Sequence, residues 1–247
     1  TQELLENLQQ RFTLRNIPHR MECYDISNFQ GSPIVGSMVV FLEGEAAKKE
    51  YRTYKMREVT SQDDFASMHE LLTRRLTRVV DGEDEPPDLL VIDGGKGQLG
   101  QAVAVLEDLG LHSIDVISLA KSRVDKVGFQ DGEVPRSPER VFIPGRKTPI
   151  VLRPNSDELF VLQRIRDEAH RKAITFHKRL RRKKAMRSTL DDIPGVGPAT
   201  RRALLMHFGS LKAIRAADVG ALHEVPMIVP SVAQAIRDLF VGETATS

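Results

Sequence analysis

The segment DLLVIDGGKGQLGQAV, residues 88–103, constrains the fold more than any other part of the chain. The apolar run that ends at Asp93 is typical of a buried strand, and the glycines after it predict a tight turn into a helix over 97–110. A second apolar run, 113–121, predicts another strand. Two strands joined by a helical crossover of about 20 residues must be parallel, which predicts an α/β sheet.

The segments on either side extend this sheet. Three β-rich segments with short polar spacers predict antiparallel strands over 19–28, 33–42 and 49–57. Apolar positions at helical spacing predict an amphipathic helix over 61–80, capped by Ser61, and a long helix over 155–184. Short apolar pieces among the prolines of 122–154, namely KVGF, RVFI and PIVL, are compatible with small strands. The element order predicts a mixed sheet with flanking helices.

The last 60 residues have a different character, with almost no strand pattern. Two stretches, 191–209 and 223–240, each combine a short helix, a Pro-led turn and a helix with an apolar stripe, which indicates an internal duplication. We therefore predict two domains, an α/β domain over 1–182 and a small all-α domain over 188–247. A linker at about 181–187 would join them.

The net charge is only +2, but positive charge is concentrated in one run. Residues 164–187 hold eleven Lys or Arg against two acids, a local charge of +9. Such a run attracts a polyanion, since Lys and Arg displace the counterions of phosphates; the alternative is a solvated helix face with a charged linker. The single cysteine, Cys23, excludes an internal disulfide and a cysteine-based zinc cluster.

No apolar stretch approaches the roughly 20 residues of a membrane span, so no membrane partner is expected. The first residues show neither an initiating Met nor a secretory signal pattern. The interpretation is a fragment of a longer cytoplasmic chain.

The sequence GGKG after Asp93 does not match a nucleotide-binding loop. A phosphate loop of the Walker type needs an earlier Gly and a Ser or Thr after its Lys, where this chain has Leu90 and Gly97. The dinucleotide pattern also lacks its acidic residue after the next strand. We therefore expect no nucleotide cofactor, and the tight turn leaves Lys96 free to project.

Asp25 and Asp93 are the candidate metal ligands. Asp93 ends a strand at the edge where open α/β sheets place their sites, and Asp25 lies in a strand that would bring it close if the two strands are neighbours. Two close carboxylates favour a bound cation, and oxygen ligands suit Mg²⁺ or Mn²⁺. His170, on or beside the apolar stripe of the long helix, is a third candidate that would favour Mn²⁺; a structural histidine is the alternative.

Several motifs together resemble the C-terminal half of the UvrC family, which belongs to the bacterial excinuclease ABC. They keep their order and spacing over nearly the whole chain: ECYDISNFQG, SQDDFASM, LLVIDGGKGQL, RIRDEAHRKAI and IPGVGPATRRALL. The resemblance implies a ribonuclease H-like endonuclease domain and tandem helix-hairpin-helix motifs. It implies the incision 5′ to the lesion in bacterial nucleotide excision repair, with damaged double-stranded DNA as substrate. The segment that binds the excinuclease ABC partner UvrB would lie in regions absent from this chain.

The resemblance also implies site residues. Its metal triad falls on Asp25, Asp93 and His170, with a further functionally important aspartate at Asp64. By analogy with the fold, Lys96 would stabilise the charge that develops on the phosphate. Further DNA contacts are expected from side chains of the basic run and from the first hairpin, namely Arg164, Arg166, Gly195, Gly197, Thr200 and Arg201. The second hairpin, PMIVPS, lacks the glycines of the first.

Three functions fit these residues. A metal-dependent DNA endonuclease is the leading hypothesis, a DNA-binding module with an inactive ribonuclease H-like domain is the second, and a resolvase or transposase-like nuclease is the third. Nicking of DNA with Mn²⁺ would separate the first from the second. A preference for branched DNA would identify the third.

Overall fold

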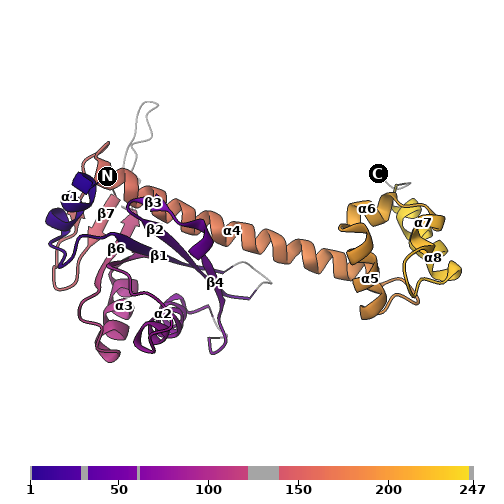
Figure 1. Ribbon diagram of the computed structural model, residues 1–247, viewed down its shortest axis with the longest axis horizontal. Helices are drawn as coiled ribbons and strands as arrows, with labels where there is room; N and C mark the ends of the chain where they lie inside the picture. Colours follow the sequence, from indigo (N-terminus) through magenta and orange to yellow (C-terminus); the bar gives the residue numbers. More distant parts are fainter. Residues whose placement is uncertain (1, 29–32, 60–61, 122–138, 245–247) are drawn as a thin grey trace, which may run out of the picture. The chain divides into compact units, whose positions relative to one another are not determined.

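The computed structural model describes residues 2–28, 33–59, 62–121 and 139–244, apart from the side chains of 121, 184–188 and 242–244. The chain divides into two compact units, residues 1–177 and 178–247 (Figure 1). Each unit has its own hydrophobic core, and the buried clusters of one unit contain no residue of the other.

One mixed sheet organises the first unit. Among the described residues it has eight strands in the order β3-β2-β1-β5-β6-β7-β8, with β4 paired to β2. The strands are β1 (Arg20–Ser27), β2 (Val35–Leu42), β3 (Glu45–Ala46), β4 (Arg52–Lys55), β5 (Leu89–Asp93), β6 (Asp115–Lys121), β7 (Glu139–Phe142) and β8 (Ile150–Val151). Strand β1 pairs antiparallel with β2 and parallel with β5, and β5 pairs parallel with β6. The predicted parallel centre and antiparallel flank are confirmed.

Helices cover both faces of the sheet (Figure 1). The core cluster on one face joins strand residues such as Cys23 and Val91 to α1 (Gln2–Phe12) and α4 (Asp157–Asp191). The cluster on the other face joins Tyr24 and Ile92 to α2 (Asp64–Val80) and α3 (Lys96–Asp108). Since side chains alternate along a strand, consecutive residues of β1 and β5 contribute to opposite cores.

Some local expectations differ from the structure. Helix α1 is absent from the prediction, although Leu5, Leu8 and Phe12 follow a helical spacing and are fully buried. Helix α2 begins at Asp64, and Asp63 caps it by accepting a hydrogen bond from the Ala66 amide at 2.9 Å. The predicted cap Ser61 and the apolar piece KVGF, 126–129, lie outside the described residues.

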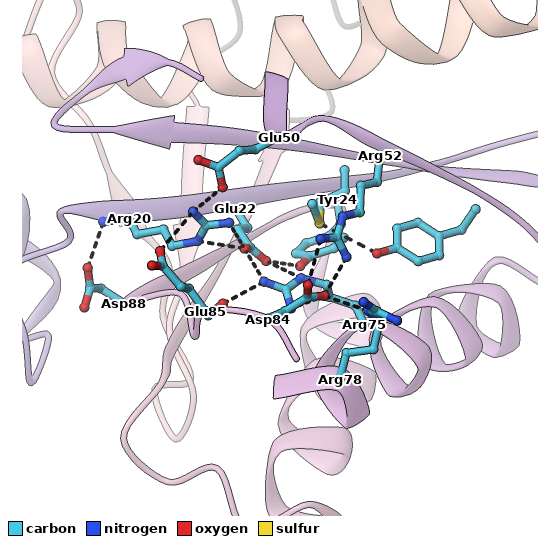
Figure 2. A network of polar contacts seen from close by, with 12 residues as sticks. Arg20, Glu22, Tyr24, Glu50, Arg52, Arg75, Arg78, Asp84, Glu85 and Asp88 are labelled. Atoms are coloured by element: carbon cyan, nitrogen blue, oxygen red, sulfur yellow. Dashed lines mark hydrogen bonds and ion pairs between the residues drawn. The ribbon is translucent and has the colours of Figure 1, made fainter. Parts of the chain in front are cut away.

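A buried network of ion pairs ties α2 to β1 on the α2 face of the sheet (Figure 2). Glu22 and Arg75, both with fully buried side chains, are joined by two hydrogen bonds of 2.7 and 3.2 Å. Arg20 and the Tyr24 hydroxyl also donate to Glu22. Asp84 accepts hydrogen bonds from Arg75 and from two further arginines, Arg52 and Arg78. Every charge at the centre of the network therefore has an opposite charge beside it.

Helix α4 is seven residues longer at its carboxyl end than predicted, and it runs through the segment 181–187 that was expected to be a linker. The sequence of that segment explains the helix, because Lys, Arg, Ala and Met all favour helix. The division between the two compact units falls inside α4, after His177.

The second unit is all-helical. Besides the end of α4 it contains α5 (Pro198–Phe208), α6 (Leu211–Ala216), α7 (Val219–His223) and α8 (Pro230–Thr244). Its core consists of apolar side chains from the end of α4 and from the later helices, among them Leu190, Ile193, Ile236 and Phe240. The predicted pair of helix–turn–helix repeats is present: one joins α4 to α5, and the other joins α7 to α8.

Candidate active site

Two aspartates lie next to each other at the carboxyl ends of parallel strands. Tyr24 on β1 pairs in register with Ile92 on β5, so the next residue on each strand is an aspartate, Asp25 and Asp93. The sequence places them there because each strand is apolar up to that point and both strands run in the same direction. This edge is where open α/β sheets place their ligands.

Both aspartates lie on the face of the sheet that α4 covers. Cys23 and Val91, two residues earlier on each strand, belong to the core shared with α4, and side chains two residues apart share a face. Asp25 is 8% exposed. Helix α4 carries His170, whose Nδ1 lies 3.7 Å from Asp25 Oδ2. The fold thus brings together an aspartate and a histidine that are far apart in sequence.

The electrostatics of Asp25 show that other acidic groups are close. Burial, and then the carboxylate of Asp93, raise the pKa of Asp25 to about 7, against the opposing effect of His170. A weaker contribution in the same direction comes from Asp64. Asp93, His170 and Asp64 therefore all lie within electrostatic reach of Asp25, as the prediction of a shared site requires.

The residues fit a divalent cation in their chemistry. Asp25 Oδ2 is buried and has no hydrogen-bond partner among the described residues. A buried carboxylate oxygen without a donor, beside a second carboxylate, is stabilised by a cation and destabilised without one. Within the part of the chain that the structure describes, no three His, Cys, Asp or Glu side chains are grouped closely enough to hold a metal ion. Binding would require the side chains to draw together.

Asp64 and Lys96 stand at the starts of helices on the opposite face of the sheet. Asp64 is the first residue of α2. Lys96 is the first residue of α3, and its Nζ donates to the Lys147 carbonyl at 2.6 Å and lies 5.6 Å from the centroid of the Phe142 ring. To reach a phosphate near Asp93, Lys96 would have to leave this carbonyl.

His177, which the sequence analysis did not select, lies near the candidate site. His177 is fully buried, and its Nε2 shares a hydrogen bond of 2.9 Å with the hydroxyl of Ser27. Ser27 lies two residues after Asp25, and His177 lies seven residues after His170, two turns further along the same helix face. The hydrogen bond between His177 and Ser27 therefore joins α4 to the end of β1. The seven-residue spacing was the available signal in the sequence.

The two arginines of α4 that were predicted as DNA contacts are engaged within the protein. Arg164 donates to Glu45 at 2.9 Å and packs over the Phe41 ring. Arg166 is 7% exposed and donates to Glu139 at 2.7 Å. A phosphate contact by Arg166 does not fit this burial, because its guanidinium faces the interior. Burial lowers the pKa of Arg166, but the Glu139 carboxylate and then Asp93 outweigh burial and raise it, so this guanidinium supplies positive charge near Asp93.

The first hairpin, between α4 and α5, uses its two glycines differently. Gly195 has a φ of +88°, and a Cβ there would come within 2.7 Å of Val232 Cγ2, so both backbone and packing require glycine. Gly197 caps α5 with an ordinary φ of −87°, and a Cβ there would have no atom within 4 Å. The space beside Gly197, at the amino end of α5, is therefore open, as a phosphate contact there requires.

The other predicted residues of this hairpin are less accessible. Thr200 is 9% exposed, and Arg201 forms an ion pair with Asp191 at the end of α4. Arg201 thus fastens α5 to α4. A phosphate would compete with Asp191 for its guanidinium.

The second hairpin, between α7 and α8, forms the same turn without glycine. Met227 stands at the position of Gly195 and adopts a φ of +70°. The hydrogen bond that closes the turn is 3.1 Å long, against 3.0 Å in the first hairpin. Val229 stands at the position of Gly197, and its side chain, 52% exposed, occupies what is open space in the first hairpin. The two turns are alike in backbone but differ in access to the helix amides.

Comparison with known proteins identifies the family of this chain. The family described as "UvrC RNAse H endonuclease domain" matches residues 9–174, and "Helix-hairpin-helix motif" matches residues 192–247. The first match covers more than half of the chain. The chain belongs to the UvrC RNase H endonuclease domain family. The fold class predicted from the sequence, a ribonuclease H-like mixed sheet with flanking helices and a small helix-hairpin-helix unit, is confirmed.

Curated relatives of the UvrC family align along nearly the whole chain. "UvrABC system protein C" of Geobacter metallireducens is 52% identical over 233 residues, which are 94% of this chain and 38% of the relative. The protein of the same name from Syntrophotalea carbinolica is 48% identical over 97% of this chain and 39% of its own length. The chain therefore spans about two fifths of the length of these relatives.

Among solved structures, endonuclease V of Ciona intestinalis bound to an inosine-containing DNA aligns with a TM-score of 0.35. It shares 12% identity over 66% of this chain and 86% of that one. No described helix has the length and apolar composition of a membrane span.

Proposed function

We propose that this chain is a metal-dependent DNA endonuclease that makes the 5′ incision in bacterial nucleotide excision repair. The observation that carries the proposal is Asp25, a buried carboxylate with an oxygen that lacks a hydrogen-bond partner among the described residues, beside Asp93 and 3.7 Å from His170. The names of the relatives support the repair context. Such an enzyme would act in the cytoplasm on damaged double-stranded DNA, and UvrB of the excinuclease ABC would be its partner.

The proposed metal ligands are Asp25, Asp93 and His170. A bound Mn²⁺ or Mg²⁺ would supply positive charge for the developing phosphorane and lower the pKa of an attacking water. The imidazole favours Mn²⁺ somewhat over Mg²⁺.

The remaining steps belong to the protein's own groups. Asp25 and Asp93, at the ends of rigid strands, orient the site at the sheet edge, and the hydrogen bond between Ser27 and His177 holds α4 so that His170 stays over Asp25. Lys96, on leaving the Lys147 carbonyl, would donate to a phosphate oxygen. Water attacks phosphorus in line, and the 3′ oxygen leaves, so that a 3′-hydroxyl and a 5′-phosphate remain. Asp64 would support the site from the start of α2.

The all-helical unit is proposed to bind duplex DNA through its first hairpin. The open space at Gly197 allows a phosphate to approach the amides of α5, where the helix dipole also favours an anion. In the second hairpin, Val229 occupies the equivalent space, so we propose that it contributes packing and no phosphate contact.

The test is nicking of supercoiled plasmid with Mn²⁺ by the wild-type chain and by the Asp25→Ala variant. We expect nicking by the wild type, loss of nicking in the variant and equal DNA affinity of both. Equal nicking by the variant would remove Asp25 from the mechanism. A DNA-binding unit without catalysis is the second candidate, favoured by the absence of a ready three-ligand group among the described residues. Absence of nicking by the wild type in both Mn²⁺ and Mg²⁺ would select it.

A further inference from the structure

Helix α4 changes character at His177. His177 is buried, and none of the described side chains between His177 and Leu190 is buried. Before this point the helix packs on the sheet, and its arginines have carboxylate partners. The pairs, with distances of 2.6–2.9 Å, are Arg164–Glu45, Arg166–Glu139 and Arg171–Glu168. The arginine charges of the first part of α4 are thus neutralised within the protein.

Past His177, four cations of α4 have no such partner among the described residues. Lys178, Arg179, Arg182 and Lys183 are all exposed, and no carboxylate lies within 4 Å of any of them among the described residues. The sequence explains the difference, because no Asp or Glu occurs between Glu168 and Asp191. No i, i+3 or i, i+4 pair with an acid is therefore available to these four side chains along the helix.

The four cations share one side of the helix. Their positions are i, i+1, i+4 and i+5, which at 100° per residue span an arc of about 140° and about 7.5 Å of helix axis. Like charges at i and i+4 destabilise a helix, so this arrangement is unfavourable for the protein alone. A polyanion laid along this side would remove the repulsion.

We infer that Lys178, Arg179, Arg182 and Lys183, here called the cationic strip, bind the phosphate backbone of duplex DNA without reading its sequence. The inference rests on the proposed function only in that the chain acts on DNA. Arg164 and Arg166, which were predicted to contact DNA, are paired with carboxylates within the protein. The cationic strip lies further along the same helix, where the cations have no such partners among the described residues.

The composition around the cationic strip favours duplex phosphates over single strands. Proteins that bind single strands combine cations with aromatic side chains on which bases stack. No Phe, Tyr or Trp occurs between Phe176 and Phe208. A strip of Lys and Arg without aromatics recognises charge and spacing alone.

The test is the salt dependence of DNA binding, measured without divalent metal on a short labelled duplex. The quadruple variant K178Q/R179Q/R182Q/K183Q removes four charges, and Gln keeps the helix propensity of Lys and Arg. If all four contact phosphates, the slope of log K against log salt becomes shallower by about 3.6. Between 50 and 200 mM salt, binding by the wild type then weakens about 150-fold more than binding by the variant.

Two further variants complete the design. The double variant K178Q/R179Q should change the slope by about 1.8, half of the full effect. The double variant K48Q/K49Q removes two exposed charges at η1 (Lys48–Glu50), and it should leave the slope unchanged. The inference is overturned if the quadruple variant changes the slope no more than K48Q/K49Q does. The segment would then either bind an acidic protein or only connect the two units. Because no metal is present, the outcome does not depend on whether the chain cleaves DNA.

Discussion

Replacement of Arg75 by Met tests whether the buried network specifies the position of α2. Met keeps most of the volume of Arg75 but removes its charge, and it leaves Glu22 fully buried without its bidentate partner. In the wild type, burial opposes the charged form of Arg75, yet the Glu22 carboxylate outweighs it and the pKa of Arg75 is raised. Arg75→Met also removes hydrogen bonds to Asp84 and to the Glu85 carbonyl, but Asp84 keeps Arg52 and Arg78, so the main cost is the loss of charge compensation at the buried Glu22 carboxylate.

The magnitude follows from what remains around Glu22. Removal of one partner from a buried ion pair costs about 3–5 kcal/mol. Arg20 and the Tyr24 hydroxyl still donate to Glu22 in the variant, which favours the lower end, about 3 kcal/mol. Arg171→Met, which breaks a largely exposed pair with Glu168, should cost only about 0.2–0.5 kcal/mol.

The chain offers a selective probe for this measurement. It has no Trp, and its three tyrosines, Tyr24, Tyr51 and Tyr54, all lie in the first unit. Urea unfolding followed by tyrosine fluorescence therefore reports the free energy of unfolding of the α/β unit alone, without a contribution from the all-helical unit.

A second variant makes the reasoning refutable. The double variant Glu22→Gln/Arg75→Met removes both charges and should recover most of the stability lost by Arg75→Met, since no uncompensated carboxylate remains. A loss below about 1 kcal/mol in Arg75→Met would contradict the account, because surface pairs cost that little. If the double variant does not recover stability, the loss in Arg75→Met comes from the packing of Arg75 and not from the buried charge of Glu22.

Three further predictions address packing, pH and DNA contact. Gly36→Ala should destabilise the α/β unit by about 1–3 kcal/mol in urea unfolding, since its Cβ would lie 1.8 Å from Leu71 Cδ1. Gly100→Ala, with nothing within 4 Å in the middle of α3, should instead stabilise the unit by about 0.4–1 kcal/mol. Hydrogen bonding to Arg52 and the other arginines holds the pKa of the Asp84 carboxyl well below its usual range, so its stabilising effect exists above pH of about 3.9 and fades as pH falls further. The stability gap between wild type and Asp84→Asn should therefore shrink in acid; a gap that widens there has the wrong sign. Gly197→Val should fold normally but weaken DNA binding and make its salt slope shallower by about 0.9, and unchanged binding would exclude the hairpin contact.

The sequence predicts the sheet well because its signals are local. The apolar run before Asp93, the glycines after it and the crossover helix are each visible within a few residues, and the handedness and pairing of the crossover follow from general rules. The adjacency of Asp25 and Asp93 was predicted only on the condition that their strands are neighbours, and the parallel pairing of β1 with β5 meets that condition. Helix α1 escapes prediction because its few buried apolar residues stand among Gln and Glu, and only the sheet they cover shows that they form part of a core.

The partners of charged side chains are not predictable in this way. Arg166 and Lys178 look equivalent in the basic run, yet one is buried against Glu139 and the other is exposed. The difference depends on β7, which is distant in sequence, and on the point where α4 leaves the sheet. His177 is a similar case, since its hydrogen bond to Ser27 joins residues 150 positions apart. Contacts of this kind require the tertiary structure.

The central claim is that Asp25, Asp93 and His170 hold one divalent cation site, and Mn²⁺ binding measured by electron paramagnetic resonance of the free ion tests it most directly. Asp25→Asn should fold at least as well as the wild type, because burial and Asp93 oppose its charged form. The account predicts that the wild type binds Mn²⁺, that Asp25→Asn and Asp93→Asn each lose this binding, and that Asp84→Asn retains it. Binding by Asp25→Asn as tight as by the wild type, or no binding by the wild type, would contradict it.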